Sequence, residues 1–219
     1  MFEESREMKK KRAGEILKRL RKKYPEVRTA LRHDSPLQML VATILSAQCL
    51  DQTVNEVTPA LFDKYPTAEA YAKAKPGELE ALIRPTGFFR NKTKSLIGMG
   101  QALVEKHGGK VPETMEELVQ IPGVARKTAN VVLQEAIRPQ GPHEGVVVDT
   151  HVRRVAYRLG LTAETVPEKI EQDLMALTPR KYWRELGMTM IWHGRDTCVA
   201  RRPKCSQCVL EEVCPKIGV

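Results

Sequence analysis

The stretch TMEELVQIPGVARKTANVVLQ, residues 114 to 134, decides the fold of this chain. Thr114 and Glu117 form a T-x-x-E capping box at the start of a helix. Pro122 and Gly123 end that helix, since proline cannot continue it and glycine tolerates a left-handed backbone. Apolar residues then recur at helical spacing: Ala129, Val132, Leu133 and Ala136. The stretch therefore predicts a helix, a tight hairpin and a second helix.

This hairpin is suited to bind an anion. The first N–H groups of the second helix have no intrahelical partner and lie at the positive end of its dipole. Lys127 adds a cation beside Gly123, Ala125 and Arg126, so a phosphate is the expected anion. Helix pairs joined by Pro-Gly also occur in all-α proteins without this role, and a lysine in a first turn is usually solvated surface. The rest of the chain must decide between these interpretations.

The composition describes an ordinary globular protein with a basic charge balance. The chain has 219 residues, 42% of them hydrophobic, and a formal net charge of +9. This charge favours a polyanionic partner, because many weak basic contacts release counterions. No apolar run approaches the roughly 18 residues that a membrane helix needs, and the N-terminus lacks the apolar core of a signal peptide. We therefore expect a cytoplasmic protein that binds no membrane.

Helix signals recur along the whole chain. Ser35, Asp51 and Thr67 are expected N-caps. Residues 37–45 have the most regular apolar face, which predicts a core helix that starts at Ser35-Pro36 and ends near residues 46–48. Residues 146–148 are three valines without a candidate partner strand, so we expect a short buried extended segment there. We predict an all-α protein of about ten helices.

Four of the five cysteines lie in the last 22 residues, in the pattern C-x6-C-x2-C-x5-C. They are Cys198, Cys205, Cys208 and Cys214. The pattern favours an iron–sulfur cluster over zinc, because zinc sites of four cysteines usually show two C-x2-C pairs. A metal-free cysteine group is the third interpretation, and the distant Cys49 is expected in a core or pocket wall. Arg201, Arg202 and Lys204 lie between the first two ligands, so the metal would fold a basic loop for phosphate contact.

Three segments and the cysteine pattern, taken in this order, resemble the endonuclease III family of helix-hairpin-helix DNA glycosylases over nearly the whole chain. The segments are ILSAQCLDQTVN at 44–55, IPGVARKTANVV at 121–132 and VVVDTHVRR at 146–154. The resemblance implies two helical domains with the active site in the cleft between them, and a [4Fe-4S] cluster on the four cysteines. The implied domains are an N-terminal helix at 1–29 that belongs to the cluster domain, a six-helix domain with the hairpin at 30–140, and the cluster domain at 141–219.

The resemblance also implies roles for single residues. Lys127 would be the nucleophile that attacks C1′ of the sugar, and Asp149 would assist departure of the base and accept a proton. Without the family match, Asp149 is a plain N-cap for the following helix, and it can be both. Gln48 would fill the gap left by a flipped nucleotide, and Phe88 would push between bases. The remaining expected DNA contacts are Arg90, Lys92, Gly123, Ala125, Arg126, His151, Arg201, Arg202 and Lys204.

An amine at position 127 implies a bifunctional enzyme, a glycosylase that also cleaves the abasic strand by β-elimination through a Schiff base. The implied partner is double-stranded DNA with a damaged base, oxidised pyrimidines being the expected class, or an abasic site. The protein is expected to be a monomer, nucleoid-associated and of prokaryotic type. A monofunctional glycosylase and a non-catalytic damage-binding protein on the same fold are the alternatives. Ala125 departs from the family pattern, which has a second glycine there, and the loop at 138–145 is expanded.

Overall fold

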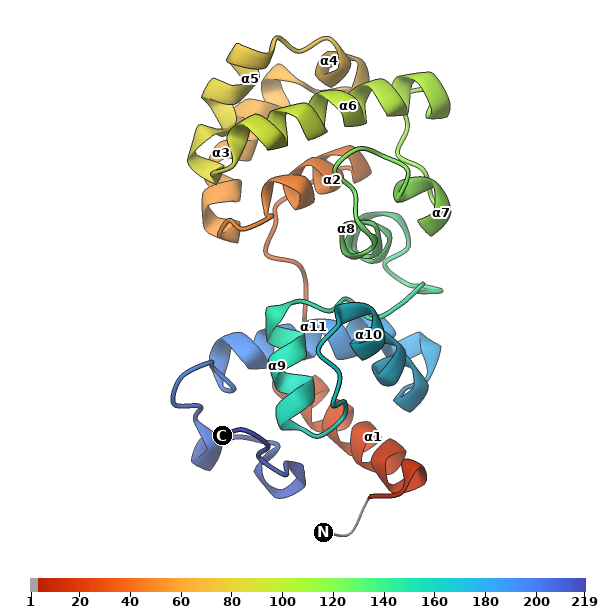
Figure 1. Cartoon of the computed structure of the whole chain (residues 1–219), viewed down its shortest axis with the longest axis vertical. Helices are drawn as coiled ribbons and strands as arrows, with labels where there is room; N and C mark the ends of the chain where they lie inside the picture. The colour runs from red at the N-terminus through yellow and green to blue at the C-terminus, as the bar shows by residue number, and fades with distance from the viewer. Residues whose placement is uncertain (1–3) are drawn as a thin grey trace. The chain divides into compact units, whose positions relative to one another are not determined.

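The structure is a computed structural model that describes residues 4–219, and no strand occurs among those residues. The predicted all-α class is confirmed. The chain divides into two compact units. One unit contains the described residues up to Arg28 together with Gly141–Val219, and the other is Thr29–Gln140. We call them the discontinuous unit and the central unit (Figure 1).

The central unit contains the hairpin. Its elements in chain order are α2 (Pro36–Leu45), α3 (Asp51–Lys64), α4 (Ala68–Ala72), α5 (Pro76–Ile83), the 3-10 turn η1 (Arg84–Thr86), α6 (Phe89–His107), α7 (Met115–Leu118), α8 (Arg126–Val132) and the π-helical turn η2 (Leu133–Ile137).

Helix α2 is the centre of this unit's core, as the sequence predicted. Ser35 caps it, and its hydroxyl accepts a hydrogen bond from the backbone N–H of Gln38 at 3.2 Å. Every residue from Met39 to Leu45 is buried. A helix that is apolar on all sides needs neighbours on all sides, and α3, α6 and α8 supply them. Full burial of each large apolar side chain contributes about 1.5–3 kcal/mol.

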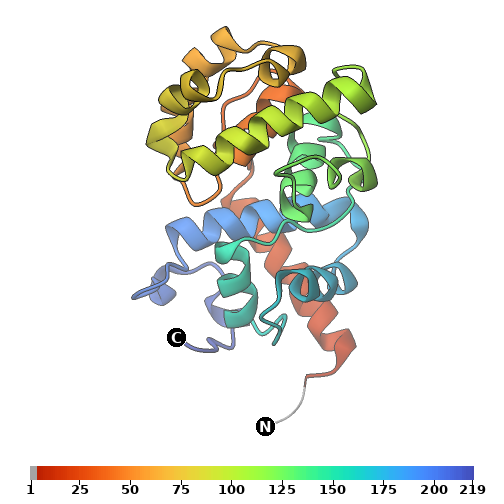
Figure 2. The same cartoon turned by 45° about the horizontal axis from the view of Figure 1, so that its top comes forward.

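Helices α4 and α6 cross at close range, and the contact depends on Gly100 (Figures 1 and 2). A Cβ atom at Gly100 would lie 2.5 Å from the backbone nitrogen of Ala72 and 2.7 Å from the backbone oxygen of Ala68. Both are backbone atoms, so no side-chain rotation can relieve the overlap. The glycine in the middle of α6 is therefore a packing requirement.

The discontinuous unit joins the N-terminal helix to the cysteine-rich end of the chain. Its elements are α1 (Arg6–Lys23), α9 (Thr150–Arg158), α10 (Pro167–Leu177), the 3-10 turn η3 (Arg180–Tyr182), α11 (Trp183–Asp196), and the 3-10 turns η4 (Cys205–Gln207) and η5 (Glu211–Val213).

The core of the discontinuous unit forms where α1 packs on α10 and α11, and where α9 packs on α11. The apolar stripe of α1 is buried, with Ile16 and Leu20 fully enclosed. Val146 and Val148 are buried in the same cluster without belonging to a strand, as the sequence predicted.

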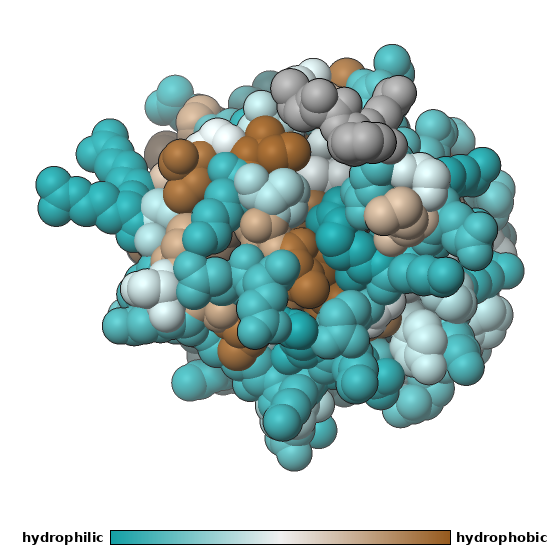
Figure 3. Space-filling view, turned by 90° about the horizontal axis from the view of Figure 1, so that it is seen from below, coloured by the Kyte–Doolittle hydropathy of each residue, from teal (hydrophilic) through white to brown (hydrophobic). Residues whose placement is uncertain are grey.

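The surface drawn in Figure 3 is mostly hydrophilic, with small separate hydrophobic areas among the described residues. None of the helices in the described part of the chain combines the length and the apolar character needed to span a bilayer.

Two sequence predictions about helix ends were wrong. Asp51 was expected to cap a helix, but the N-cap of α3 is Leu50, and Asp51 is the first residue inside the helix. The helix after the hairpin was expected to continue regularly to Ala136, but it changes to π-helical geometry at Leu133. Wider π turns are set by tertiary packing, which apolar spacing alone does not reveal.

We predict that Gly100→Ala lowers the free energy of unfolding by roughly 1–3 kcal/mol, because the added methyl overpacks the α4–α6 contact. Gly77→Ala is the matched control: this glycine is also helical and in the same unit, and its added Cβ would meet no atom within 4 Å. The control should change stability by less than about 1 kcal/mol. Urea unfolding of both variants measures this, and equal stabilities would contradict the packing argument.

Candidate functional site

The hairpin has the predicted order of a helix, a turn and a second helix, but α7 ends at Leu118 and does not continue to Pro122. The Thr114 hydroxyl accepts a hydrogen bond from the Glu117 backbone N–H at 3.3 Å and donates one to the Glu117 carboxylate at 2.6 Å, which starts α7. Ile121 and Val124 are buried and anchor the turn in the core. The Val124 backbone N–H donates to the Ile121 carbonyl at 3.0 Å. The residues between and after these two anchors are held at the surface.

Gly123 gives the turn its shape. Its φ is +82°, and a Cβ atom there would lie 2.6 Å from Cβ of Ser95. Ala125 has φ −83°, which any L-residue adopts easily, and it is the N-cap of α8 without a side-chain cap bond. The backbone N–H groups at the start of α8 are therefore not covered by a capping side chain, and alanine at position 125 needs no unusual conformation.

Lys127 is the second residue of α8 and its side chain is exposed. Its ammonium forms no hydrogen bond or ion pair with any residue in the range 4–219. Arg126 beside it is also exposed. The Lys127 amine is thus available to a partner outside the described chain.

Two other loops of the central unit present exposed side chains from a left-handed backbone. Gln48 follows the end of α2 with φ 52°, and Phe88 is the N-cap of α6 with φ 48°. Phe88 is 63% exposed. Cys49, next to Gln48, packs partly buried against the core, as expected for a wall residue. Arg90 is exposed, with its guanidinium 5.7 Å from the centre of the Phe89 ring.

Lys92 corrects one of our predictions. We expected it to contact DNA directly, but it is only 5% exposed. Its Nζ donates to the carbonyls of Leu45 at 2.7 Å and Thr86 at 2.8 Å. An ammonium held inside by two backbone carbonyls cannot reach a phosphate on the outside.

Asp149 and His151 lie at the start of α9, in the discontinuous unit. The Asp149 Oδ1 accepts hydrogen bonds from the backbone N–H groups of His151 and Val152, each at 2.8 Å. Asp149 is therefore the N-cap of α9, as one of our two interpretations held. These cap bonds use only one of its two carboxylate oxygens. The His151 ring is half-buried, with its Nδ1 3.2 Å from the Arg154 guanidinium.

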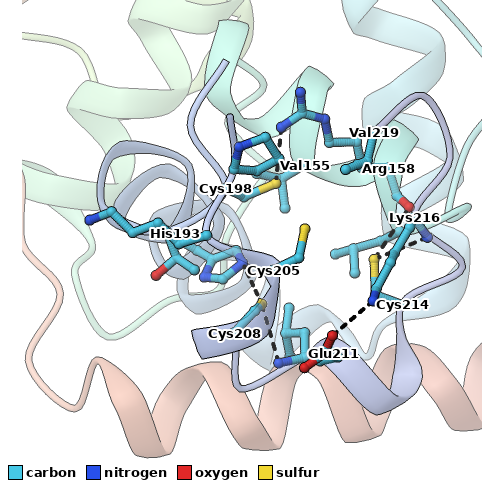
Figure 4. A pocket seen from close by; sticks show the side chains of 15 residues that line it. Val155, Arg158, His193, Cys198, Cys205, Cys208, Glu211, Cys214, Lys216 and Val219 are labelled. Atoms are coloured by element: carbon cyan, nitrogen blue, oxygen red, sulfur yellow. Dashed lines mark hydrogen bonds and ion pairs between the residues drawn. The ribbon is translucent and has the colours of Figure 1, made fainter. Parts of the chain in front are cut away.

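The four clustered cysteines line one pocket together with residues of α9 and α11. Their side chains reach it from the segment between the end of α11 and the C-terminus (Figure 4). Cys49 belongs to the central unit and does not line this pocket. The structure thus brings together the four residues that spacing predicted as ligands.

Hydrogen-bond donors surround the sulfur atoms. The backbone N–H groups of Leu210 and Lys216 donate to Cys208 and Cys214 at 3.4 and 3.3 Å. Arg158 Nη1 lies 3.5 Å from the Cys198 sulfur. Such N–H groups stabilise thiolate sulfur and are one of the means by which a protein tunes an iron–sulfur cluster.

His193 of α11 lines the cysteine pocket and contacts one of its sulfur atoms. Its Nε2 lies 3.6 Å from the Cys208 sulfur, and its side chain is buried. Burial, and secondarily the Lys23 ammonium, lowers the pKa of His193 to about 4. The ring is therefore neutral at pH 7.

Burial also raises the pKa of the Cys208 and Cys214 thiols. A cysteine binds metal as the thiolate, so metal binding must displace these protons. Four soft sulfur ligands around one pocket, with N–H donors to the sulfurs, fit a [4Fe-4S] cluster.

The basic loop is held by two arginines that the sequence analysis missed. Arg158 donates to the carbonyls of Val199 at 2.7 Å and Ala200 at 3.0 Å. Arg154 Nε donates to the Cys198 carbonyl at 3.0 Å. The two are four residues apart on α9, which places them on one helix face, and this spacing was the available signal.

The cations expected to contact phosphate are on the outside of that loop. Arg201, Arg202 and Lys204 are all exposed, and Arg202 has φ 53°. The backbone N–H of Lys204 donates to the Thr197 carbonyl at 3.0 Å, which closes the loop beside its first cysteine. The loop can thus present three cations from a fixed backbone.

Two known protein families match the parts of the chain that contain the hairpin and the four clustered cysteines. The family described as HhH-GPD superfamily base excision DNA repair protein matches residues 41–180. The iron-sulfur binding domain of endonuclease III matches residues 198–214, which begin and end at the outer two cysteines of the pocket. The predicted iron–sulfur cluster is thereby confirmed.

Relatives match along nearly the whole chain. Endonuclease III of Synechocystis sp. (strain ATCC 27184 / PCC 6803 / Kazusa) is 53% identical over 207 residues, which cover 94% of this chain and 93% of the relative. A non-covalent endonuclease III–DNA complex has a TM-score of 0.88 at 38% identity, covering 94% of this chain and 95% of that one. A trapped endonuclease III–DNA covalent intermediate has the same TM-score and identity, with coverage of 94% and 96%.

The hairpin, the N-cap Asp149 and the cysteine pocket therefore lie in a chain that belongs to the endonuclease III family, within the HhH-GPD superfamily of base excision DNA repair proteins.

Proposed function

We propose that this protein is a bifunctional DNA glycosylase and AP lyase of base excision repair, with Lys127 as its nucleophile. The observation that carries this proposal is the state of Lys127: it is exposed, free of partners within residues 4–219, and located one residue after the start of a helix whose first N–H groups are uncapped. An amine can form a covalent intermediate with a sugar carbon, which a hydroxyl or amide at this position could not do as readily.

The reaction follows from amine chemistry at C1′. The damaged nucleotide leaves the base stack first, since its C1′ is not accessible inside a duplex. The Lys127 nitrogen bonds to C1′ while the bond from C1′ to the base breaks, and the amine loses a proton. The sugar ring then opens to a Schiff base. Removal of a 2′ proton allows the 3′ phosphate to leave by β-elimination, and water finally releases the lysine.

Asp149 is the proposed proton acceptor and the anion that stabilises positive charge on the sugar. Its N-cap bonds fix the carboxylate through Oδ1 and leave Oδ2 outside the cap. A carboxylate held by its own helix keeps a defined direction without an additional partner. These bonds support a role as a positioned base.

The surface of the central unit supports the proposed DNA contacts. The uncapped amides after Gly123 and Ala125 suit a phosphate, and Arg126 adds a positive charge there. Gln48 would occupy the space left by the flipped nucleotide, and Phe88 would stack between bases of the opposite strand. The exposure of both side chains supports these roles.

In the discontinuous unit, the basic loop is the proposed second contact with the DNA backbone. When bound, the [4Fe-4S] cluster supplies bonds to four thiolates and so crosslinks the chain on both sides of the loop. Arg154 and Arg158 fix the loop backbone from α9, and the exposed side chains of Arg201, Arg202 and Lys204 would bind phosphates. His151, half-buried at the start of the same helix, is a further proposed contact.

We propose oxidised pyrimidines in double-stranded DNA, and abasic sites, as the substrates, and a monomer acting on nucleoid DNA as the working form. Rates on a panel of duplexes containing an oxidised pyrimidine, uracil, a mismatched thymine or an abasic site test the substrate class. Highest activity on uracil or mismatched thymine would overturn the proposed preference. Base release without strand cleavage would instead indicate a monofunctional glycosylase.

We predict that borohydride traps a covalent complex between this protein and a damaged duplex, and that Lys127→Ala abolishes trapping and strand cleavage. The reason is that reduction fixes the Schiff base only if the lysine nitrogen carries it. Lys94→Ala, which removes an exposed lysine from α6, is the control and should trap like the unchanged protein. A trapped complex that persists without Lys127 would refute the assignment, and tight binding without cleavage by the unchanged protein would indicate a damage-binding protein.

We predict a large loss of DNA binding on substitution of Gly123 in the hairpin, and little change on substitution of Ala125. Gly123→Ala should weaken DNA binding roughly tenfold or more, because the new Cβ would clash with Ser95 and the backbone is left-handed. Ala125→Gly should change binding by less than about threefold, because the alanine backbone is already unstrained. Fluorescence anisotropy with a labelled abasic duplex measures both. A large gain from Ala125→Gly would show that the alanine does limit phosphate contact.

We predict that Cys208→Ser lowers the iron content of the protein, removes its brown colour and makes the segment 199–204 sensitive to trypsin. The loss of one thiolate would release the crosslink that, in our proposal, holds the loop. Cys49→Ser, in the central unit, is the control and should retain full iron content. Normal protease resistance in iron-depleted Cys208→Ser protein would show that the arginine contacts alone hold the loop.

A further inference from the structure

The buried lysine of the central unit has an unusual environment. Lys92 lies in the first turn of α6, and its ammonium is enclosed with two backbone carbonyls as its hydrogen-bond partners. No carboxylate in the described chain forms an ion pair with it. Burial lowers the pKa of this ammonium from its ordinary value. Burying an ammonium group costs desolvation free energy, and packing alone does not explain why a lysine occupies this position.

Its two acceptors belong to different loops. The Leu45 carbonyl is at the C-terminal end of α2, where carbonyls lack intrahelical partners, and Gln48 follows three residues later. The Thr86 carbonyl is at the end of η1, two residues before Phe88. One nitrogen atom therefore connects the loop that carries Gln48 with the turn that carries Phe88.

The backbone of Lys92 makes the ordinary first-turn hydrogen bond of α6 to the same turn. Its N–H donates to the Phe88 carbonyl at 3.1 Å. The side chain of Lys92 thus contacts Thr86, and its main chain contacts Phe88, on the two sides of Gly87. Phe88 is fixed from both directions, although its ring is exposed.

Gln48 and Phe88 are also the only non-glycine residues of the central unit with positive φ, a unit that lies wholly within the described chain. A left-handed backbone is unfavourable for an L-residue, and it persists where surrounding contacts determine it. The Lys92 ammonium supplies such a contact close to each of them. The strained backbone, the exposed side chains and the shared lysine coincide at these two loops.

We propose that Lys92 is a positioning residue for DNA distortion: its ammonium ties the end of α2 to the turn before α6, so that Gln48 and Phe88 are presented together to the duplex. This inference rests on the proposed insertion of both side chains into DNA. Lys92 itself touches no DNA in this role. It acts by restricting two loops that otherwise would each have to be ordered when DNA binds, and pre-ordering of this kind strengthens binding.

The test is Lys92→Met, which keeps a long apolar side chain but removes every N–H donor. The two carbonyls lose their partner, and we expect base excision under single-turnover conditions to fall roughly ten- to hundredfold. Fluorescence of 2-aminopurine placed beside the lesion should show a matching loss of base unstacking. Lys94→Met, an exposed lysine two residues further along α6, is the matched control and should leave both signals unchanged.

A double-mutant cycle separates positioning from general destabilisation. In a protein that already carries Gln48→Ala and Phe88→Ala, adding Lys92→Met should lower the excision rate less than about twofold, because its targets are gone. An equal loss in both backgrounds, or no loss in the unchanged background, would overturn the proposal. Lys92→Gln takes the place of Lys92→Met in the same cycle if the methionine variant does not fold.

Borohydride trapping keeps this inference separate from the proposed function. If the unchanged protein forms no covalent adduct with damaged duplex, the proposed function fails. If it forms the adduct and Lys92→Met unstacks DNA normally, only the role of Lys92 fails.

Discussion

Helix ends leave backbone N–H and carbonyl groups without intrahelical partners, and an all-helical protein must satisfy each one that is not in water. In this protein, side chains meet that requirement beside the residues proposed to act on DNA. Asp149 binds the N–H groups at the start of α9, and Lys92 binds the last carbonyl of α2. Arg158 does the same for carbonyls of the basic loop. The loops are consequently ordered by local polar contacts as well as by burial.

Helix α9 shows how this requirement joins separate parts of one unit. Its N-cap is the proposed catalytic carboxylate, and Arg154 and Arg158 on its body hold the loop after the first cysteine. A short helix thus fixes the direction of Asp149 and the course of the basic loop at once. A change in the packing of α9 on α11 would alter both together. The same helix that begins at the proposed catalytic residue also contributes Val155 and Arg158 to the lining of the cysteine pocket.

The sequence revealed the features that depend on neighbours along the chain. The caps at Ser35 and Thr114 form because each hydroxyl reaches an N–H three residues later, and this spacing is visible in the sequence. Four cysteines within 17 residues likewise indicate a metal site without knowledge of the fold.

Features that depend on tertiary contacts were not accessible in this way. Lys92 looks like any basic residue in a first helical turn, and its burial follows from the meeting of α2, η1 and α6. Asp51 lies where a cap is expected, but the backbone turns into the helix one residue earlier. Arg154 and Arg158 have cationic side chains that suit DNA equally well, and the structure shows that they bind carbonyls of their own chain.

The discontinuous unit has a consequence for the order of synthesis. Helix α1 is made before the whole central unit, yet it packs on α11, and its Arg19 donates to the carbonyl of Val209 beside the third cysteine. At roughly 5–20 residues per second, the ribosome needs on the order of 10–40 s to make the intervening chain. During this time the central unit is completed, whereas α1 lacks the surface for its apolar stripe until α10 and α11 have been made. Docking of α1 and insertion of the cluster are therefore late events that complete the same unit.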